Sequence, residues 1–375
     1  MKYDVAIVGC GAMGSASAWA CTQHGASVIA FDRYAPPHHF GSTHGHTRII
    51  REAYYEHPLY VPLVRRAYEL WSQLEAAAGE RLWQQTGGIM VGPEDGPLVR
   101  GASGSARAHG IRHEMLDARA FEARFPMYRT HADWVALFEE RAGILFPERC
   151  LRAFHRLAHA ARAELCVGAQ VMRWSATSEG VRVHTTRGDY DARCLVVSAG
   201  PWLPTFAAQL HTRIPLEIER QLSHWFRPVT SPELFAADRC PVGLWETKPD
   251  DVFATLPDEG HGVKCGTHHA GATTSADGVI RSVTADEQDA VRAVLDMVMP
   301  GAAGELLESR VCLYTNTPDH HFIIDWDVDG RVLVASPCSG HGFKFASAIG
   351  EIVAQLTLEG RSWIDLAPFS LSRFR

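Results

Sequence analysis

The sequence lacks several features that would place it in a specialised class of protein. Among its 375 residues, 36 are Lys or Arg and 43 are Asp or Glu, so the net charge is −7 and basic residues are not in excess. This balance argues against nucleic acid as a partner, because cations must neutralise the phosphates there. No block of five like charges occurs, so no charged tail is predicted.

Long apolar runs, repeats and a disulfide pattern are also missing. No apolar stretch approaches the roughly 18 residues of a membrane-spanning helix, so no membrane partner is expected. The first residues, MKYDVAIV, lead directly into a glycine-rich loop and leave no room for a signal peptide, which predicts a cytoplasmic location. The nine cysteines, an odd number scattered through a long chain, do not suggest a disulfide framework.

The elements that the sequence does predict are those of an α/β protein, α+β overall. With 46% hydrophobic residues the chain can form a large core, and its length suggests two or three domains. Strand and helix patterns typical of a Rossmann-like nucleotide-binding fold occur at the start, the middle and the end. We therefore expect a discontinuous cofactor domain with an inserted substrate domain of mixed or antiparallel β-sheet. The predicted ranges are 1–85, 150–210 and 311–375 for the cofactor domain, and 86–149 and 211–310 for the substrate domain.

A dinucleotide-binding motif lies near the N-terminus. Gly9, Gly11 and Gly14 form G-x-G-x-x-G between a short apolar strand and a helix of small residues, and Asp32 ends the next strand. The glycines allow a tight turn, close approach of a pyrophosphate and close helix packing, and the carboxylate suits a ribose hydroxyl. The motif predicts dinucleotide binding but does not separate NAD from FAD.

Seven further segments carry a recognisable pattern. They are 41–51 (GSTHGHTRIIR), 198–202 (SAGPW), 312–315 (CLYT), 322–325 (FIID), 339–344 (SGHGFK), 365–369 (DLAPF) and 371–374 (LSRF). Together with the glycine motif, they resemble one flavoenzyme family, that of monomeric sarcosine oxidase and N-methyl-L-tryptophan oxidase, within the D-amino-acid-oxidase-like superfamily. The likeness begins at residue 3 and extends to the C-terminus.

The resemblance implies an FAD-dependent oxidase that acts on the CH–NH bond of a secondary amine. The expected reaction is oxidative demethylation of an N-methyl L-amino acid to the amino acid, formaldehyde and hydrogen peroxide, with oxygen as acceptor and the enzyme a monomer. Cys312 matches the cysteine that holds FAD through an 8α thioether. The residues expected at the cofactor are Gly9, Gly11, Met13, Gly14, Asp32, Arg33, Ser42, His44, Thr47, Arg48, Val171, Gly200, Cys312, Gly340, Gly342 and Lys344.

The resemblance also implies a set of catalytic residues with a physical logic. A guanidinium at Arg51 and an amine at Lys344 suit a substrate carboxylate. A fixed cation at Lys264 favours the reduction of oxygen to an anion. If Arg48 and Arg51 lay on one regular strand, alternation would direct their side chains to opposite faces. This argues against both of them facing the same active site. The full set is Lys264, Arg48, Arg51, His268, Tyr314 and Lys344.

Several alternatives stay open at this point. The glycine motif by itself also fits an NAD-dependent dehydrogenase, and the family pattern also fits a protein that binds FAD without turnover. The substrate could be another amine or imino acid, because Phe253, Thr267 and the Leu244-Trp245 pair depart from the relatives' pattern. Hydride transfer and a flavin adduct are both compatible with the sequence.

The histidines supply a further candidate site. His38, His39, His44 and His46 share one loop, and His320 and His321 are adjacent. Adjacent pairs in a loop are a weak signal for zinc, which needs ordered spacing and a preformed shell. No metal is therefore expected, and the loop has no assigned role beyond His44, which matches a histidine near the flavin.

Overall fold

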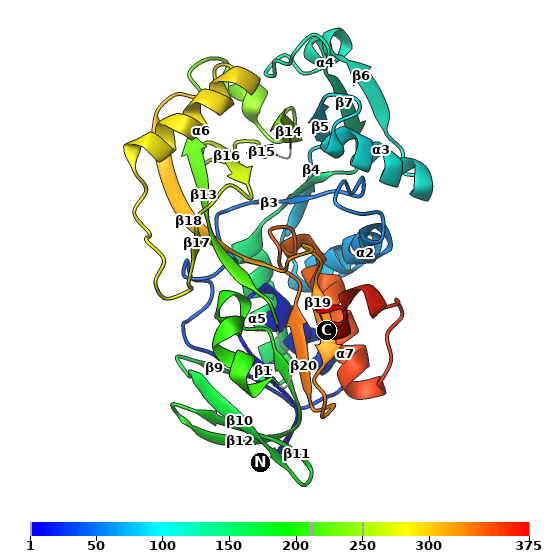
Figure 1. Ribbon diagram of the computed structural model, residues 1–375, viewed down its shortest axis with the longest axis vertical. Coiled ribbons are helices and arrows are strands. Elements are labelled where there is room, and N and C mark those ends of the chain that lie inside the picture. The colour runs from blue at the N-terminus through cyan, green and yellow to red at the C-terminus, as the bar shows by residue number, and fades with distance from the viewer. Residues whose placement is uncertain (1, 211–213, 250, 375) are drawn as a thin grey trace.

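The structure, a computed structural model, describes residues 2–210, 214–249 and 251–374. The molecule is elongated, with one β-sheet in its lower half and a second in its upper half (Figure 1). The first sheet has the order β10-β11-β12-β1-β2-β9, with β20 beside β12 and β19 beside β20. Its strands are β1 (Lys2–Val8), β2 (Val28–Asp32), β9 (Glu164–Val167), β10 (Val171–Thr177), β11 (Gly180–Thr185), β12 (Gly188–Val197), β19 (Ile323–Trp326) and β20 (Val332–Ser336).

The centre of the first sheet is parallel and buried on both faces. Strands β20, β12, β1, β2 and β9 run parallel to one another, and their apolar runs are continuous, as expected when both faces are covered. Helix α1 (Ala12–Gln23) contacts α5 (Pro147–Ala160) and α7 (Ala346–Glu359). A Cβ on Gly350 would lie 2.6 Å from the carbonyl oxygen of Ala16, so small residues permit the close approach of α7 to α1.

The second sheet is mostly antiparallel, in the order β17-β13-β16-β15-β14-β5-β7-β6 with β18 beside β13. Only the β14–β5 pair in this order is parallel. Helices α3 (Pro97–His109), α4 (Ala118–Arg124) and α6 (Ala285–Val298) belong to this half (Figure 1). The strands are β5 (Gly88–Gly92), β6 (Glu114–Asp117), β7 (Val135–Glu139), β13 (Glu217–Phe226), β14 (Val242–Lys248), β15 (Asp251–Leu256), β16 (Val263–His268), β17 (Thr273–Thr274) and β18 (Leu306–Asn316).

A small third sheet positions the segment that carries the two predicted arginines. It contains β3 (Arg48–Ile50), β8 (Gly143–Leu145) and β4 (Trp83–Gln85), and α2 (Tyr60–Ala78) follows β3 in the chain. The buried carboxylate of Glu139 accepts hydrogen bonds of 2.8 Å from the backbone N–H groups of Glu52 and Ala53. These bonds fix the chain where it leaves β3.

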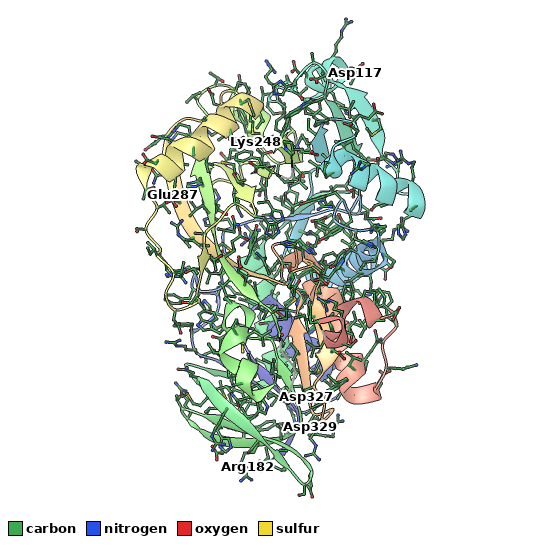
Figure 2. The ribbon with its side chains drawn as sticks, viewed as in Figure 1. Asp117, Arg182, Lys248, Glu287, Asp327 and Asp329 are labelled. Atoms are coloured by element: carbon green, nitrogen blue, oxygen red, sulfur yellow. The ribbon has the colours of Figure 1, made fainter. Side chains whose placement is uncertain are left out.

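The predicted fold class is confirmed: a Rossmann-like α/β part is joined to a mixed, mainly antiparallel sheet. Asp117 at the start of α4 and Arg182 on β11 mark opposite ends of the molecule (Figure 2). The predicted boundary at residue 311 falls inside β18, which pairs with β13 throughout its length. The division into domains remains a prediction, and its boundary at 210 adjoins residues outside the described part.

Within residues 2–210, 214–249 and 251–374, no helix combines the length and apolarity needed to cross a bilayer.

Candidate active site

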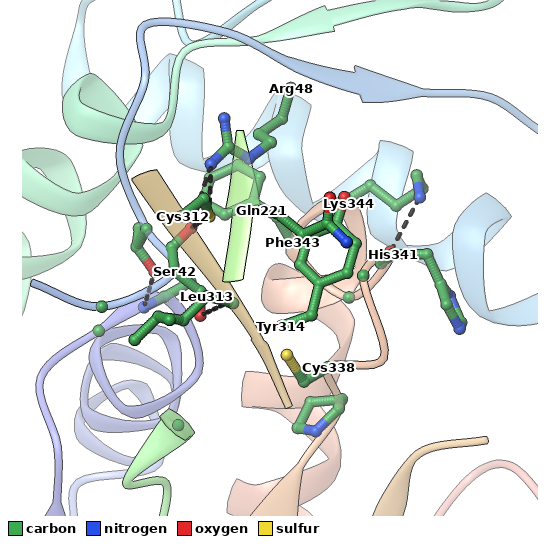
Figure 3. A pocket seen from close by; sticks show the side chains of 18 of the residues that line it. Ser42, Arg48, Gln221, Cys312, Leu313, Tyr314, Cys338, His341, Phe343 and Lys344 are labelled. Atoms are coloured by element: carbon green, nitrogen blue, oxygen red, sulfur yellow. Dashed lines mark hydrogen bonds between the residues drawn. The ribbon is translucent and has the colours of Figure 1, made fainter. Parts of the chain in front are cut away.

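Residues of both sheets line one cavity, which contains most of the predicted site residues. Figure 3 shows part of its wall, around Cys312, Tyr314 and Lys344. One end is formed by the glycine loop after β1 and by the end of β2. The other end is formed by side chains from β16, β18 and the loop before α7. The predicted residues that line it are Gly9, Gly11, Met13, Asp32, Ser42, Thr47, Arg48, Arg51, Gly200, Lys264, His268, Cys312, Tyr314, Gly340, Gly342 and Lys344.

The glycine loop has no room for larger residues at two of its three positions. A Cβ on Gly14 would lie 1.8 Å from the carbonyl oxygen of Gly9, and one on Gly9 would lie 2.5 Å from that of Ser198. Gly9 also has a φ of +93°, which favours glycine. At Gly11 the nearest atom, Thr43 Oγ1, is 3.6 Å from a built Cβ, so the space beside it belongs to the cavity.

The end of β2 completes a dinucleotide-binding surface. Asp32 accepts hydrogen bonds of 2.8 Å from the backbone N–H groups of Cys10 and Tyr34, and its carboxylate still faces the cavity. Helix α1 begins at Ala12 without a side-chain cap from Gly11, and the Ala12 N–H donates to the Thr43 hydroxyl at 3.3 Å. The start of the helix and its dipole are directed at the same space. The glycines, the helix start and the carboxylate together fit the pyrophosphate and ribose of FAD.

Cys312 lies deep in the cavity wall, on β18, where the 41–48 segment contacts that strand. Its side chain is buried, and its Sγ is 3.8 Å from an Arg48 guanidinium nitrogen and 3.7 Å from the carbonyl oxygen of Ser42. The Ser42 hydroxyl donates to the carbonyl of Leu313 at 2.5 Å. The thiol therefore faces the cavity with a cation beside it (Figure 3).

Arg51 is buried and already has a carboxylate partner. Strand β3 ends at Ile50, so alternation no longer holds at the next residue, and both Arg48 and Arg51 line the cavity. One Arg51 nitrogen lies 2.8 and 2.7 Å from the two Glu56 oxygens. Burial acts to raise the pKa of Glu56, but the charges of Arg51, His341 and Lys344 outweigh it, and this pKa lies below its usual value.

Lys344 is the second buried cation at this end. It lies in a short 3-10 turn, Phe343–Phe345, just before α7 rather than inside it. Its amine donates to the His341 carbonyl at 2.8 Å and to the Tyr54 hydroxyl at 3.3 Å. Burial and the positive charge of Arg51 lower the pKa of Lys344 to about 7, against the opposing effect of Glu56. This amine can therefore gain or lose its charge near neutrality.

Lys264 on β16 is held by the loop between β2 and β3. Its buried amine donates to the carbonyl oxygens of Gly45 at 2.9 Å and Thr47 at 2.6 Å, and lies 5.3 Å from the centre of the Trp225 ring. Burial and the Arg48 cation lower the pKa of Lys264 well below its usual value. The two carbonyls fix the amine at the cavity wall.

His268 and Tyr314 form a pair on neighbouring parts of the second sheet. His268 Nδ1 lies 3.0 Å from the Tyr314 hydroxyl. Burial and the adjacent His269 lower the pKa of His268 well below its usual value, so its ring is neutral near pH 7. A Cβ on Gly340, which has a φ of +78°, would lie 2.6 Å from both rings. Glycine is therefore required for the 339–344 loop to approach them.

Four predicted cofactor residues do not line this cavity. Gly14 packs against Gly9 and Ile7 below the loop. Arg33 is exposed and forms an ion pair with Asp277 at 3.0 Å. Val171 is buried at the start of β10 in the core of the first sheet. His44 is buried and lines a second cavity, described below.

The sequence did not indicate other residues that face the cavity. They include Glu56, Gln221, Cys338 and His341. His341 lies inside the recognised 339–344 segment and was the easiest to find, whereas Glu56 had only its spacing of five residues from Arg51 as a signal. Gln221 lies on β13, in a stretch with no motif, and its position depends on sheet pairing alone.

The residues that depart from the relatives' pattern lie on both faces of the second sheet, and only one face borders the cavity. Leu244 lines the cavity, and so does Ala254, its cross-strand partner. Trp245 and Phe253 also pair with each other but are fully buried in the core on the opposite face, as the period of two along a strand requires. Phe253 and Trp245 therefore do not shape the cavity directly, whereas Leu244 and Thr267 do.

Within residues 2–210, 214–249 and 251–374, no group of three or more His, Cys, Asp or Glu residues has an arrangement that could hold a metal ion.

Comparison with known proteins gives matches over almost the whole chain. The FAD dependent oxidoreductase family matches residues 4–356. The monomeric sarcosine oxidase of Streptomyces avermitilis is 37% identical over 363 residues, which cover 96% of this chain and 94% of that protein. The N-methyl-L-tryptophan oxidase of Salmonella arizonae is 35% identical over 378 residues, and 100% of each chain is covered.

Solved structures agree on the fold. NikD, described as an unusual amino acid oxidase essential for nikkomycin biosynthesis, superposes with a TM-score of 0.86 at 23% identity, over 98% of this chain and 97% of NikD. L-proline dehydrogenase from P. horikoshii has the same TM-score at 20% identity and covers 100% of this chain. At these identities the likeness concerns the fold alone.

Proposed function

This chain belongs to the FAD-dependent oxidoreductase family, and we propose that it oxidises the secondary amine of an N-methyl amino acid. The overall reaction converts the N-methyl amino acid, oxygen and water into the amino acid, formaldehyde and hydrogen peroxide. Full-length relatives named monomeric sarcosine oxidase and N-methyl-L-tryptophan oxidase support this substrate class. The observation that carries the proposal is the pair of buried cations, Arg51 and Lys344, in the same cavity as the dinucleotide cradle.

The cofactor is held by residues of both sheets. Bound FAD supplies the two-electron oxidation of the carbon attached to nitrogen and its own reoxidation by oxygen. Gly11 and the start of α1 accommodate the pyrophosphate, and Asp32 accepts from a ribose hydroxyl with the lone pairs that its two backbone bonds leave. Cys312 would hold the flavin through a thioether at the 8α position, and Arg48 lies beside its sulfur.

The substrate carboxylate binds Arg51 and Lys344. Arg51 offers a planar fork, and Lys344 supplies a compact charge. Glu56 already holds one nitrogen of the Arg51 guanidinium. The substrate carboxylate therefore binds the Arg51 donors that remain, together with Lys344. A substrate without a carboxylate would leave this pair undisturbed and would bind poorly.

The same cations favour the reactive form of the amine. Oxidation requires a nitrogen with a free lone pair, and nearby positive charge at Arg51, Lys344 and Lys264 disfavours a protonated amine. His268 and Tyr314 orient the amine, since a neutral imidazole has one donor and one acceptor nitrogen. Fixing the amine and the carboxylate together restricts the substrate to one orientation over the flavin.

Lys264 serves the oxygen half of the reaction. The first electron given to oxygen creates an anion, which a fixed ammonium group stabilises in a buried setting. The Gly45 and Thr47 carbonyls accept from the amine and hold it in place. An anion formed from oxygen would favour the protonated amine, against the burial and the Arg48 charge that lower the pKa of Lys264.

A panel of N-methyl amino acids, with peroxidase-coupled detection of peroxide, tests the proposed function. Sarcosine and N-methyltryptophan are the first two members, with their N-demethylated counterparts as controls. We expect peroxide and formaldehyde in equal amounts from one or more N-methyl compounds. Oxidation of cyclic imino acids alone would contradict the proposal, and a protein without flavin absorbance would favour the NAD-dependent alternative.

The covalent link has its own test. Acid-precipitated wild-type protein should keep its yellow colour, because the thioether survives denaturation. Cys312→Ala should release the colour to the supernatant, whereas Cys338→Ala, which changes a thiol on the same cavity, should not. Colour in the wild-type supernatant would contradict the link.

The proposal includes the oligomeric state and the location: the enzyme acts as a monomer in the cytoplasm. All nine cysteines are unpaired, which supports a reducing compartment. Light scattering after size exclusion should give the mass of one chain, and a dimer would contradict this part.

A further inference from the structure

A second cavity lies behind the loop that holds Lys264. Its volume is about 780 Å³, within the size range of small-molecule sites. Its walls come from the 37–47 loop, the first turns of α5 and the β18 segment that precedes Cys312. Thr47 and His38 line both cavities, so this loop separates the second cavity from the catalytic one.

The second cavity has an unsatisfied group at its wall. His44 is 3% exposed, and no hydrogen bond of normal geometry reaches either of its ring nitrogens among the described residues. Burial and the cations Arg48, Arg310 and Lys264 lower the pKa of His44 to about 2, against a weak opposing effect of the Gly41 carbonyl. A buried, neutral imidazole with both nitrogens unpaired is costly, so a ligand that accepts its N–H would remove that cost.

The charges around this cavity select the sign of the ligand. Four arginines and three glutamates line it, which leaves a formal charge of +1 before any of its five histidines takes a proton. Two of the glutamates are occupied: Glu148 accepts from the Gly45 and His46 N–H groups at 2.7 and 3.3 Å, and Glu308 pairs with Arg310. The third, Glu259, has a pKa raised by burial, against the opposing charges of Arg149 and Arg81.

Two of the arginines have free guanidinium groups. Arg149 and Arg152 are three residues apart on α5, so they share one face of the helix. Both side chains are exposed. Arg149 lies over the Phe146 ring at 4.4 Å, and its charge opposes the rise in the Glu259 pKa. Among the described residues, neither arginine has a hydrogen bond or a close ion pair. Two free cations and one buried unpaired imidazole thus border the same space.

We infer that this second cavity is a binding site for a small oxyanion, a phosphate or a polycarboxylate, held by His44, Arg149 and Arg152. Arginine forks match both oxyanions, and the imidazole N–H supplies a donor at the base of the site. Phosphate and polycarboxylate share this chemistry, and the choice between them is left to the binding experiment. The site is separate from the carboxylate site at Arg51, which lies across the 44–47 loop.

Calorimetric titration of the FAD-loaded enzyme with inorganic phosphate, and separately with citrate, tests the inference. Loading FAD first prevents phosphate from occupying the dinucleotide cradle. We expect saturable binding of one anion per chain at physiological salt. Whichever of phosphate and citrate binds with the lower Kd identifies the class of ligand. Arg149→Gln and Arg152→Gln should each weaken binding about tenfold, the effect of losing one charged contact.

Matched variants separate this site from surface effects. Arg100→Gln removes an exposed arginine on α3 and should leave binding unchanged. His44→Leu should abolish binding, and His44→Gln, which keeps a donor, should retain part of it; thermal melting checks that both fold. Binding that Arg100→Gln weakens as much as Arg152→Gln does, or no saturable binding of either anion, would overturn the inference.

Discussion

The two ends of the catalytic cavity are built in different ways. At the dinucleotide end, backbone atoms of a few consecutive residues form the surface, and Gly9 and Gly14 have no space for even one added carbon. At the other end, side chains come from separate elements and meet only through the packing of two sheets. The first kind of site depends on the exact path of the chain, and the second can be altered one group at a time while the fold remains.

The largest effect is expected at the dinucleotide end. Gly14→Ala places a Cβ 1.8 Å from the Gly9 carbonyl oxygen, so the turn must shift and FAD should be lost entirely, seen as colourless purified protein. Gly104→Ala is the control, because a Cβ there meets nothing within 4 Å and should stabilise α3 by roughly 0.5–1 kcal/mol. If purified Gly14→Ala contained a full complement of FAD, the dinucleotide end would tolerate side-chain changes as the other end does, and the proposed difference between them would be wrong.

The next effect concerns the buried pair at the other end. Arg51→Gln removes a carboxylate-binding fork and leaves the half-buried Glu56 without its cation. We expect kcat/KM to fall about 100-fold or more and the free energy of unfolding to drop by about 3 kcal/mol. Steady-state kinetics and denaturant titration measure the two losses.

A double variant separates these two losses. Arg51→Gln with Glu56→Gln should recover most of the stability but none of the activity, because no unpaired charge remains buried and no fork has been restored. Recovery of activity would mean that Arg51 serves only to neutralise Glu56.

Lys264 should affect one half-reaction alone. Lys264→Met removes the positive charge that we place beside oxygen, and reoxidation of the reduced enzyme should slow by about 100-fold, with reduction by substrate nearly unchanged. Stopped-flow absorbance follows both steps. Lys248→Met, a change at an exposed lysine of the same sheet, should alter neither, and equal slowing of both steps would argue against the role.

The smallest effect is a pH dependence at Lys344. The pKa of about 7 means that the amine of the free enzyme is charged below pH 7 and neutral above it. A bound carboxylate favours the charged form, so the Kd for a carboxylate without an amine, such as acetate, should rise by up to about tenfold per pH unit above 7. Flavin absorbance titrations measure it, and Lys344→Arg should flatten the profile. A flat wild-type profile from pH 6 to 9 would contradict the assignment.

The difference between the two ends also explains which parts of the site were predictable. Gly9, Gly11, Gly14 and Asp32 lie within 24 residues and follow from local geometry, and the structure places all but Gly14 on the cavity. Cys312, Lys264 and Lys344 came from the family resemblance. Their presence in one cavity is now seen, whereas their roles stay predictions.

Other positions could not be read from the sequence. Arg33 follows Asp32 in the chain, yet it points to Asp277 at the surface, because the direction of a side chain at a strand end depends on the partner that packs there. The sequence assigned no role to Glu56, and only the return of the chain after β3 brings it to Arg51. The division of Trp245 and Leu244 between core and cavity follows from the register of β14, which pairing with β15 and β5 fixes.

By itself, the sequence determined the fold class and the dinucleotide turn, since short-range sterics and motif spacing fix these. The residues expected of a flavin-dependent amine oxidase came from the family resemblance. The tertiary structure alone decided which charges are paired. It placed Arg51 against Glu56, left His44 unpaired beside a second cavity and put Lys264 between two carbonyls. The physical reason is that burial and long-range contacts, which set the energy of a charge or a polar group, arise only when distant segments meet.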